Sequence, residues 1–546
     1  MSGSPTPVGF VDPLRGPETS ARYWTTVNAA EALPGVPTPL SWSWYDIGTE
    51  KAQIAGRVLV GASPVGTRPS RDRDQRHLGI FYGRCALNVD VWRSFADAIP
   101  GTSGNSMERD FLSNVRPGHP TRALPQRYPI VAVKAPLAFR RARRELIMGA
   151  QDHRRWWREA VTAMDSADEQ QARAAFADAL SDFENHVGLA HLIATMAANG
   201  LYDALARICA KAGLPGLERA LTTAMDTEET QLLAQLWALR SAPDTDSFLA
   251  EFGYQGPAAG ELAKSSWRDD PGLLASVLDR YRTLPDDQNP EIRAIRQHAE
   301  AVHARDQLLG ALPRPARRPA AMLLRLAHSY LPLRESGRAA VLRTVDVARA
   351  AAKVVGSHAV ADGRIHRPDD VFMCTVPEII GEARQPSADE LKFRRERWEL
   401  YQTMQVPAVW TGLPTPSLIV AQPDEETVTL QGIGTGGGTV EGRARVVVDP
   451  SSDDDLEPGE ILVCHTTDPS WVSLFHYAAA VVIDIGGAVS HGAIVARELG
   501  VPCVINTGNG SRRLHSGDLI RVDGDAGTVV RLDSAPTEHD LLEEHT

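Results

Sequence analysis

The spacing of apolar residues divides the chain into a long helical stretch and a shorter stretch of strands. Between about residues 86 and 400, apolar side chains recur at intervals of three and four, as at Leu189, Ile193 and Met196. This is the period of an amphipathic helix. The run AAVLRTVDVARAAAKVVG keeps this period, and its final residue, Gly356, is predicted to end the helix. Helices are therefore expected to dominate the middle of the chain.

Short apolar runs take over after the glycine-rich segment GIGTGGGTVEG, which spans residues 432–442. The runs RARVVV, EILVCHT, AAVVIDI and PCVIN are each bounded by turn residues and predict buried strands. The segment DLIRVDGDAGTVVRL predicts a hairpin that turns at 524–527. Two helices are expected between these strands, one capped by Asp468 and one from about Gly492 to Leu499, ending at Gly500. This alternation predicts a small α/β domain.

The amino-terminal part differs from both stretches. Prolines recur every few residues in PGVPTPLSWSW (34–44), so extended structure and turns are expected there instead of a long helix. The predicted fold class is a multidomain α plus α/β protein, in which a large, mainly helical domain precedes a small α/β domain. The expected division is 1–420 for the helical domain, 421–438 for a flexible linker, 439–533 for the α/β domain and 534–546 for a loose tail.

Composition narrows the classes of function. With 546 residues and a net charge of -12, the chain is too long for a single core, and its charge argues against sequence-independent binding to nucleic acid. Its five cysteines show no C-x-x-C spacing, which fits a reducing compartment. The sequence shows neither a secretion signal nor an apolar run long enough to cross a membrane, so a cytoplasmic location is expected.

One histidine stands out in the predicted α/β domain. His491 follows a buried strand and a glycine-rich turn, and it directly precedes a helix. Free backbone N–H groups and the positive end of a helix favour a bound phosphate at such a place. The same dipole disfavours a protonated imidazole, which leaves the ring nucleophilic. A histidine that only packs or caps the helix is the alternative interpretation.

The residues around His491 carry a family resemblance. The stretch GGAVSHGAIVARELGVPCV resembles the phosphohistidine swivelling domain of the PEP-utilising enzyme family, and the resemblance extends over nearly all of residues 439–531. It implies that His491 accepts a phosphoryl group and passes it to a second substrate. It also implies that Gly487, Ser490 and Gly492 hold the phosphate, with Arg497 as a charge partner.

The upstream part is similar to the acceptor-binding domain of the rifampicin phosphotransferase branch of this family, beginning with YWTTVNAAEALPGVPTPLSWSW (23–44). This similarity implies a pocket for a hydroxylated, largely apolar small molecule. The residues expected to line it are Trp42, Trp44, Tyr45 and Phe81. Tyr254 and Gln255 stand where a His-Arg pair is expected, so the chemistry at the acceptor is expected to differ.

Full-length members of the family begin with an ATP-grasp domain, and this sequence starts where that domain should already have ended. The sequence also lacks a P-loop. The resemblance therefore implies that ATP and Mg²⁺ bind to a separate ATP-grasp partner, and that this chain itself holds no metal or cofactor. Two alternatives remain open: a phosphorylation-driven dehydratase or condensing enzyme of secondary metabolism, and a non-catalytic binding subunit. Direct use of PEP would need a TIM barrel that the helical stretch does not resemble.

Three further features have weaker interpretations. The run GIGTGGG superficially matches a dinucleotide-binding loop, but a strand is predicted after it where such a loop needs a helix. His186 and His191 are spaced off the i, i+4 pattern of zinc ligands, so they either line the acceptor pocket or are ordinary core or surface residues. The basic and aromatic segment 139–159 is either a solvated helix face or a docking surface for a partner.

Overall fold

The computed structural model describes residues 9–27, 29, 33, 35–112, 115–223, 225–241, 244–286, 289–419, 428–448, 456–467, 471–486 and 491–532. Contacts group the chain into two compact units. The helical unit consists of Met1–Gln235, Asp244–Asp270 and His298–Ile419. The sheet unit consists of Leu236–Pro243, Pro271–Gln297 and Val420–Thr546. Two short segments of the predicted helical domain therefore belong to the sheet unit.

The helical unit is built mainly from long amphipathic helices. Its helices are α2 (Pro39–Leu59), α3 (Val89–Ala96), α4 (Gly104–Leu112), α5 (Tyr128–Met148), α6 (Ala150–Ala163), α7 (Glu169–Asp182), α8 (Gly188–Lys211), α9 (Leu217–Leu221), α11 (Thr245–Phe252), α14 (Arg314–Tyr330), α15 (Leu333–Ala361), α16 (Val376–Ile379) and α17 (Ala388–Gln402). The division between the units passes through α10 (Glu228–Leu239) and α13 (Pro290–Ala311). The helices expected for the middle of the chain are thus present.

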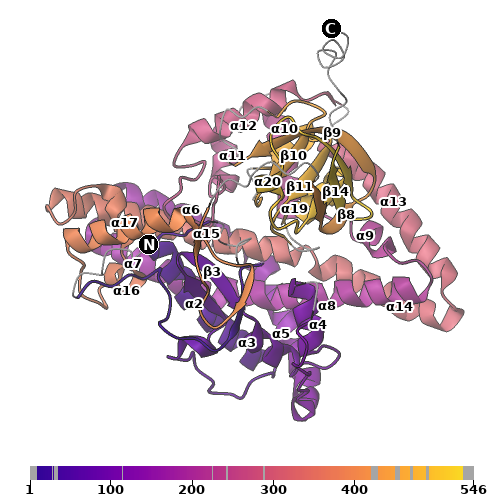
Figure 1. Cartoon of the computed structure of the whole chain (residues 1–546), viewed down its shortest axis with the longest axis horizontal. Helices are drawn as coiled ribbons and strands as arrows, with labels where there is room; N and C mark the ends of the chain where they lie inside the picture. The colour runs from indigo at the N-terminus through magenta and orange to yellow at the C-terminus, as the bar shows by residue number, and fades with distance from the viewer. Residues whose placement is uncertain are drawn as a thin grey trace, which may run out of the picture. The chain divides into compact units, whose positions relative to one another are not determined.

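Helix α15 is the central element of this unit. It has 29 residues and packs along α6, α7 and α8 (Figure 1). The prediction that Gly356 ends this helix is wrong, because the helix continues to Ala361. A Cβ at Gly356 would lie 2.4 Å from the carbonyl oxygen of Pro368, so this glycine permits close packing. The helix stops before Gly363, whose φ of +72° is the left-handed conformation typical of a helix end.

The proline-rich segment near the amino terminus also differs from its prediction. Residues from Pro39 onward form the 21-residue helix α2, where extended structure was expected. Thr38 caps the helix by accepting a hydrogen bond from the backbone N–H of Ser41. Pro39 is the first residue of the helix, a position at which a missing N–H breaks no helical hydrogen bond. The prolines therefore define where this helix begins.

A small sheet joins the two ends of the helical unit. Its strand order is β2 (Leu78–Phe81), β3 (Arg84–Asn88), β1 (Tyr23–Thr25) and β5 (Val409–Thr411). Strand β1 pairs antiparallel with β5, and Trp24 lies opposite Trp410. The same unit contains the short pair β4 (Met404–Gln405) and β6 (Ser417–Leu418). Segments nearly 400 residues apart in sequence thus pair directly.

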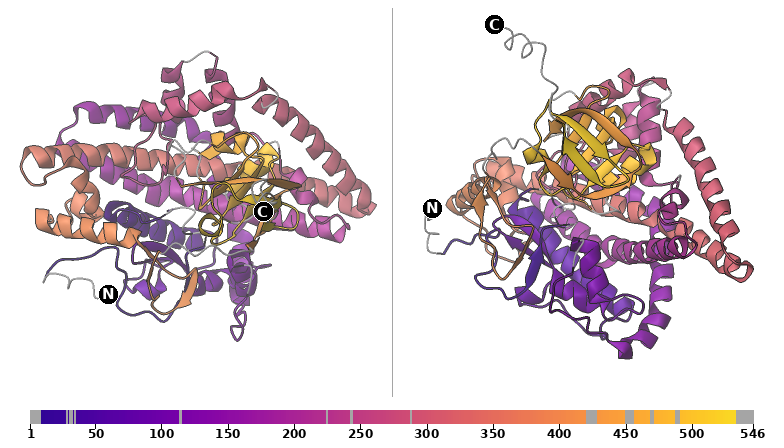
Figure 2. Two further views of the ribbon diagram at one scale, coloured as in Figure 1. Left: turned by 45° about the horizontal axis from the view of Figure 1, so that its top comes forward. Right: turned by 45° about the vertical axis from the view of Figure 1, so that its right-hand side comes forward.

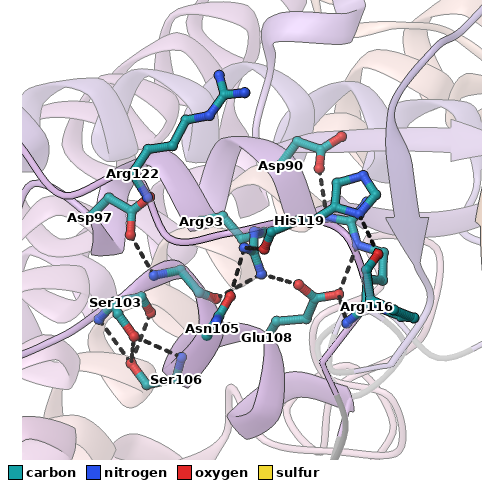
Figure 3. Close-up of polar contacts among 12 residues, drawn as sticks. Asp90, Arg93, Asp97, Ser103, Asn105, Ser106, Glu108, Arg116, His119 and Arg122 are labelled. Carbon is teal, nitrogen blue, oxygen red and sulfur yellow. Dashed lines mark hydrogen bonds and ion pairs between the residues drawn. The ribbon is translucent and has the colours of Figure 1, made fainter.

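A buried ion-pair network holds α3 and α4 together (Figure 3). Glu108 is fully buried and accepts hydrogen bonds from the guanidinium groups of Arg93 and Arg116. Arg116 also pairs with Asp90 at 2.7 Å, and Arg93 donates to the carbonyl of His119 at 2.6 Å. Because each buried charge has an opposite charge or a carbonyl as partner, this cluster fits a structural role.

The sheet unit is centred on one eight-stranded sheet (Figure 2). Its order is β7 (Thr429–Gln431), β14 (Thr528–Arg531), β13 (Leu519–Asp523), β9 (Thr439–Val447), β10 (Ile461–Cys464), β11 (Ala480–Ile483), β12 (Cys503–Ile505) and β8 (Ile433–Gly436). Strands β9, β10, β11 and β12 are parallel, and the other pairings are antiparallel. The unit also contains α12 (Pro271–Thr283), α18 (Val472–Tyr477), α19 (His491–Leu499) and α20 (Gly510–Arg513). The predicted strands, the hairpin and the helix ending at Gly500 are all found, whereas Asp468 lies outside the described residues.

The segment expected to be a flexible linker contributes β7 and β8 to this sheet. Every second residue of the run GIGTG is a glycine whose missing side chain faces neighbouring backbone. A Cβ at Gly432, Gly434 or Gly436 would lie 2.3, 2.2 or 2.0 Å from a carbonyl oxygen. Glycine here allows backbone segments to approach closely, which neither a linker nor a dinucleotide loop explains.

The described residues contain no helix with both the length and the hydropathy needed to cross a bilayer.

Candidate functional site

Polar residues gather where the parallel strands of the sheet unit end. His465 follows β10, Asp484 follows β11, and Asn506 and Thr507 follow β12. The carboxyl ends of parallel strands lie at one edge of a sheet, which is where ligands bind in open α/β folds. Asn506 has a φ of +63°, the left-handed conformation, so the chain turns sharply as it leaves β12. Ser511 of α20 contacts Asp484 at the same edge. We call His465, Asp484, Thr507 and Ser511 the carboxyl-edge cluster.

Asp484 is the buried centre of the carboxyl-edge cluster, and its side chain is 1% exposed. Its Oδ1 accepts from the Thr507 hydroxyl and from the Ser511 backbone N–H, both at 3.0 Å. Its Oδ2 accepts from the Ser511 hydroxyl and pairs with Nδ1 of His465 at 3.2 Å. A Cβ at Gly510 would lie 2.9 Å from the hydroxyl oxygen of Thr507 and 3.1 Å from Oδ1, so this glycine lets α20 approach the carboxylate closely. Four partners therefore fix a buried carboxylate at this edge.

His465 links the buried carboxylate to solvent. Its side chain is 42% exposed, whereas that of Asp484 is fully buried. The backbone of His465 continues the hydrogen bonding between β10 and β11, because its carbonyl accepts from the N–H of Ile485 at 3.0 Å. An ionised carboxylate only accepts hydrogen bonds, so the paired Nδ1 must carry the proton and Nε2 keeps its lone pair while the ring is neutral.

The first turn of α19 lies at the same edge. His491 is the first residue of this helix. The sequence predicts a helix directly after His491, and the helix begins at that residue. A Cβ at the next residue, Gly492, would lie 2.5 Å from Cδ1 of Ile483 and 2.7 Å from the hydroxyl of Thr467. Gly492 therefore lets the helix start directly against the end of β11 and the segment after β10. The side chain of His491 lies outside what the structure describes.

The predicted phosphate-binding residues are placed only in part. Gly487 and Ser490 lie outside the described residues. Gly492 lies at the carboxyl edge, whereas Arg497 is in the last turn of α19. Arg497 lies six positions after His491, which is about 9 Å along the helix axis. A basic residue near a helix carboxyl end also complements the helix dipole, and the phosphate-binding role of all four residues stays a prediction.

The four residues predicted to line the acceptor pocket lie in different parts of the hydrophobic core. Trp44 belongs to the cluster around α15, Trp42 to a cluster with Ile80 and Tyr401, and Phe81 to a cluster with Trp24 and Trp410. All three are at most 2% exposed. Tyr45 packs between the first two clusters and donates its hydroxyl to the carbonyl of Gly260 at 3.0 Å. Their role at an acceptor stays a prediction.

The helical unit contains a cavity of about 520 Å³ that the sequence did not indicate. Its lining comes from α5, α6, α10, α15 and the end of α7, and it includes part of the basic and aromatic segment 139–159. Ionisable residues on its wall are Glu145, Asp152, His153, Arg154, Asp182, His186, Asp226, Glu228 and Arg343. This volume lies in the range of pockets that hold small organic ligands.

Tyr254, which replaces the histidine expected from the family, lies behind this cavity. It is fully buried, and its hydroxyl accepts from Nη2 of Arg343, a residue of the cavity wall, at 3.4 Å. The guanidinium of Arg343 also stands 4.7 Å from the centre of the tyrosine ring. Gln255 is 5% exposed. The position at which the sequence departs from the expected His-Arg pair thus lies next to the cavity, where Tyr254 contacts Arg343.

His186 and His191 have different environments. His186 is 61% exposed and lines the cavity, whereas His191 packs against Gly337 of α15. Burial, together with the guanidinium groups of Arg334 and Arg338, lowers the pKa of His191 to about 4. The ring is therefore neutral in the folded chain at neutral pH.

This depressed pKa predicts acid sensitivity of the helical unit. Between pH 6.5 and about 4 the unfolded chain binds more protons at His191 than the folded chain does, so the free energy of unfolding falls as the pH is lowered through this window. We expect His191→Leu to reduce the loss of stability between pH 7 and pH 5 by about 2 kcal/mol. Chemical denaturation of both proteins at the two pH values measures this. His186→Leu is the control, and an equal effect there would contradict the assignment.

Two family models match the chain. Residues 456–527 match the PEP-utilising enzyme mobile domain, and residues 188–335 match the rifampicin phosphotransferase fourth domain. Residues 456–527 are therefore similar to the mobile domain of the PEP-utilising enzymes. The resemblance expected from the residues around His491 is therefore confirmed, and the carboxyl-edge cluster lies within this domain.

Three relatives illustrate the similarity. A rifampicin phosphotransferase of Streptomyces sviceus is 30% identical over 296 residues, which are 52% of this chain and 34% of that protein. The prodigiosin synthesizing transferase PigC of Serratia marcescens is 30% identical over 297 residues, 53% of this chain and 33% of PigC. An uncharacterised protein of Mycobacterium tuberculosis is 36% identical over 281 residues, 52% of this chain and 30% of that protein. The matches thus span about a third of the relatives' length.

A solved structure of Enzyme I matches 64% of this chain and 85% of its own at 15% identity, with a TM-score of 0.16, too low to inform the fold.

Proposed function

We propose that the chain is the phosphoryl-carrying and acceptor-binding part of a phosphotransferase, with His491 as the covalent carrier. The observation that supports this most strongly is the match of residues 456–527 to the mobile domain of the PEP-utilising enzymes, with His491 as the first residue of α19. A helix amino terminus presents backbone N–H groups to a phosphate. A neutral imidazole there is a competent nucleophile.

The proposed reaction has two steps. In the first, a nitrogen of His491 attacks the phosphorus of the donor, and the bond between phosphorus and the donor's leaving group breaks. In the second, an acceptor hydroxyl attacks the phosphorus, the N–P bond breaks and the imidazole of His491 is regenerated. Splitting one transfer into two lets donor and acceptor bind at separate sites. The mobile domain then carries the phosphoryl group between them.

The donor in this proposal is ATP with Mg²⁺, bound by a separate ATP-grasp protein. Residues 1–546 contain no P-loop. The partner would bind ATP and transfer a phosphoryl group to His491. In this first step the present chain would supply only the nucleophile.

The acceptor in this proposal is a small molecule with a hydroxyl group. The match of residues 188–335 to the rifampicin phosphotransferase fourth domain supports it. The cavity of about 520 Å³ in that unit is the proposed binding site, because its wall combines apolar and charged residues. In this assignment Arg343, which Tyr254 contacts, helps to orient the acceptor.

A second candidate is a condensing enzyme in which phosphorylation activates a group for displacement. The similarity to PigC, whose name describes a prodigiosin synthesizing transferase, favours it. Both functions share the phosphorylated His491 and differ in the product. Mass analysis distinguishes them, since a phosphate ester retains the phosphoryl group and a condensation product releases it as inorganic phosphate.

Labelling tests the carrier directly. The chain is incubated with ATP labelled at the β- or γ-phosphate, alone and with an ATP-grasp protein, and separately with phosphoramidate, a small phosphoryl donor that needs no partner. We expect label that is stable in base and lost in acid, located by peptide mapping to His491. Label from ATP only in the presence of the ATP-grasp protein would support the divided system. Label at another residue, or none from any donor, would contradict the proposed carrier.

A further inference from the structure

The carboxyl-edge cluster contains a histidine that neither the sequence motif nor the proposed carrier step uses. His465 is half exposed, and its inner nitrogen pairs with the fully buried Asp484. A histidine oriented by a buried carboxylate is the arrangement that enzymes use for proton transfer, because the carboxylate selects the tautomer and stabilises the protonated ring. The contacts of His465 are therefore those of a group that transfers protons.

We propose that His465 is the general base of the transfer step, and that it removes the proton from the acceptor hydroxyl as the phosphoryl group leaves His491. This inference rests on the proposed function, in which the acceptor hydroxyl must lose its proton, and it assigns that proton to His465. Asp484 is a positioning residue in it, and Thr507 and Ser511 hold Asp484 in place.

The geometry of the ring supports this role. Nδ1 faces the buried carboxylate at 3.2 Å, so the exposed part of the ring is the edge that carries Nε2. Since Asp484 only accepts hydrogen bonds, the proton of the neutral ring resides on Nδ1 and the lone pair on Nε2. The hydroxyl of Thr507 and the N–H and hydroxyl of Ser511 also donate hydrogen bonds to the carboxylate of Asp484. These bonds hold the carboxylate in its orientation toward His465. Nε2 is thus a proton acceptor that faces solvent.

The location of His465 supports it as well. Thr467, two residues further along the chain, lies against Gly492, the neighbour of His491. Two residues of extended chain span at most about 7 Å. The carbonyl of His465 also accepts from Ile485, in the segment that leads to His491. The backbone of His491 and the ring of His465 therefore lie at the same end of the sheet.

The proton and electron balance is complete without another reactant. The acceptor O–H bond breaks, its proton moves to Nε2 of His465, and the oxygen forms a bond to phosphorus. The N–P bond breaks and its electron pair stays on the nitrogen of His491. The protonated His465 is paired with Asp484 until it releases its proton to water. In the reverse direction the same ring donates a proton to the departing oxygen.

The reverse direction gives a test that needs no knowledge of the natural acceptor. Two aryl phosphates serve as probes and donate their phosphoryl group to His491. The leaving group of 4-nitrophenyl phosphate departs as a stable anion, so it needs little protonation, whereas that of phenyl phosphate is far more basic. We expect His465→Ala to slow labelling of His491 by phenyl phosphate about a hundredfold, with labelling by 4-nitrophenyl phosphate nearly unchanged.

Matched variants and rescue make the test specific. His515→Ala is the control, because His515 is an exposed histidine of the same unit that also lies near an aspartate, Asp518, at 3.9 Å. It should label like the original chain with both esters. Free imidazole added to His465→Ala should restore labelling by phenyl phosphate. Asp484→Asn should show the same ester-selective loss as His465→Ala, whereas misfolding would reduce labelling by both esters.

The possible failures are distinguishable. If His465→Ala slowed the labelling of His491 by both esters equally, the inference would be overturned and His465 would be a structural residue. Unchanged labelling rates with both esters would also overturn it. If phosphoramidate labels His491 in the original chain but neither ester does, the inference fails while the proposed carrier stands. If no donor labels His491, the proposed carrier itself fails.

Discussion

Replacing His491 with alanine is expected to reduce product formation, measured with the proposed ATP-grasp partner present, by at least about a thousandfold, because the variant lacks the nitrogen proposed to carry the phosphoryl group. The residue begins α19 at the carboxyl edge of the sheet, within the matched mobile domain. The change removes an imidazole and adds nothing bulky, so the fold should persist. Product formation in the presence of the nucleotide-binding partner measures the effect.

The appropriate control for this variant is His515→Ala in the same unit. It tests whether loss of any exposed histidine affects turnover. If His491→Ala kept full turnover under conditions in which His515→Ala also did, a direct transfer from donor to acceptor would replace the two-step reaction. Thermal unfolding of both variants shows whether the sheet unit remains folded.

Gly434→Ala is expected to destabilise the sheet unit by about 3 kcal/mol or more. A Cβ at this position would lie 2.2 Å from the carbonyl oxygen of Gly524 and 2.9 Å from its carbonyl carbon. Both are backbone atoms, which cannot rotate away as a side chain can. Strand β8 would have to separate from the turn between β13 and β14. Hydrogen exchange of peptides from these strands, together with thermal unfolding, measures the change.

The neighbouring Gly437 provides a matched substitution. The closest atom to a Cβ there is Oδ1 of Asp525 at 3.1 Å, the end of a flexible side chain. Gly437→Ala is therefore expected to cost less than about 1 kcal/mol. Equal losses in the two variants would mean that the glycines serve chain flexibility and not close backbone packing.

The parts of the fold that could be predicted are those that local pattern determines. The runs that became β9, β10, β11 and β12 are continuous apolar segments, as strands covered on both faces require. Helix α2 does not follow from the local pattern, because the recurring prolines before it predict extended structure, whereas proline at the first position is compatible with a helix. The inclusion of Pro271–Gln297 in the sheet unit depends on tertiary contacts, which no local pattern records.

The site was predictable only where a motif marks it. His491 was found from its flanking residues, whereas His465 and Asp484 were missed. A signal for them existed, because each is a polar residue directly after a buried parallel strand, and such residues meet at one edge. The acceptor pocket was expected around aromatic residues near the amino terminus. The structure places Trp42, Trp44 and Phe81 in the core, and the cavity lies among helices α5, α6, α10 and α15.

The pairing of β1 with β5 has a consequence for biosynthesis. Because Trp24 lies opposite Trp410, β1 lacks one of its two neighbours until more than 400 residues have been made. During translation the amino-terminal strand waits with an open edge while the intervening helices fold, and the small sheet is completed only when Val409–Thr411 leaves the ribosome. Assembly of the helical unit is therefore finished late, shortly before residues 456–527 emerge.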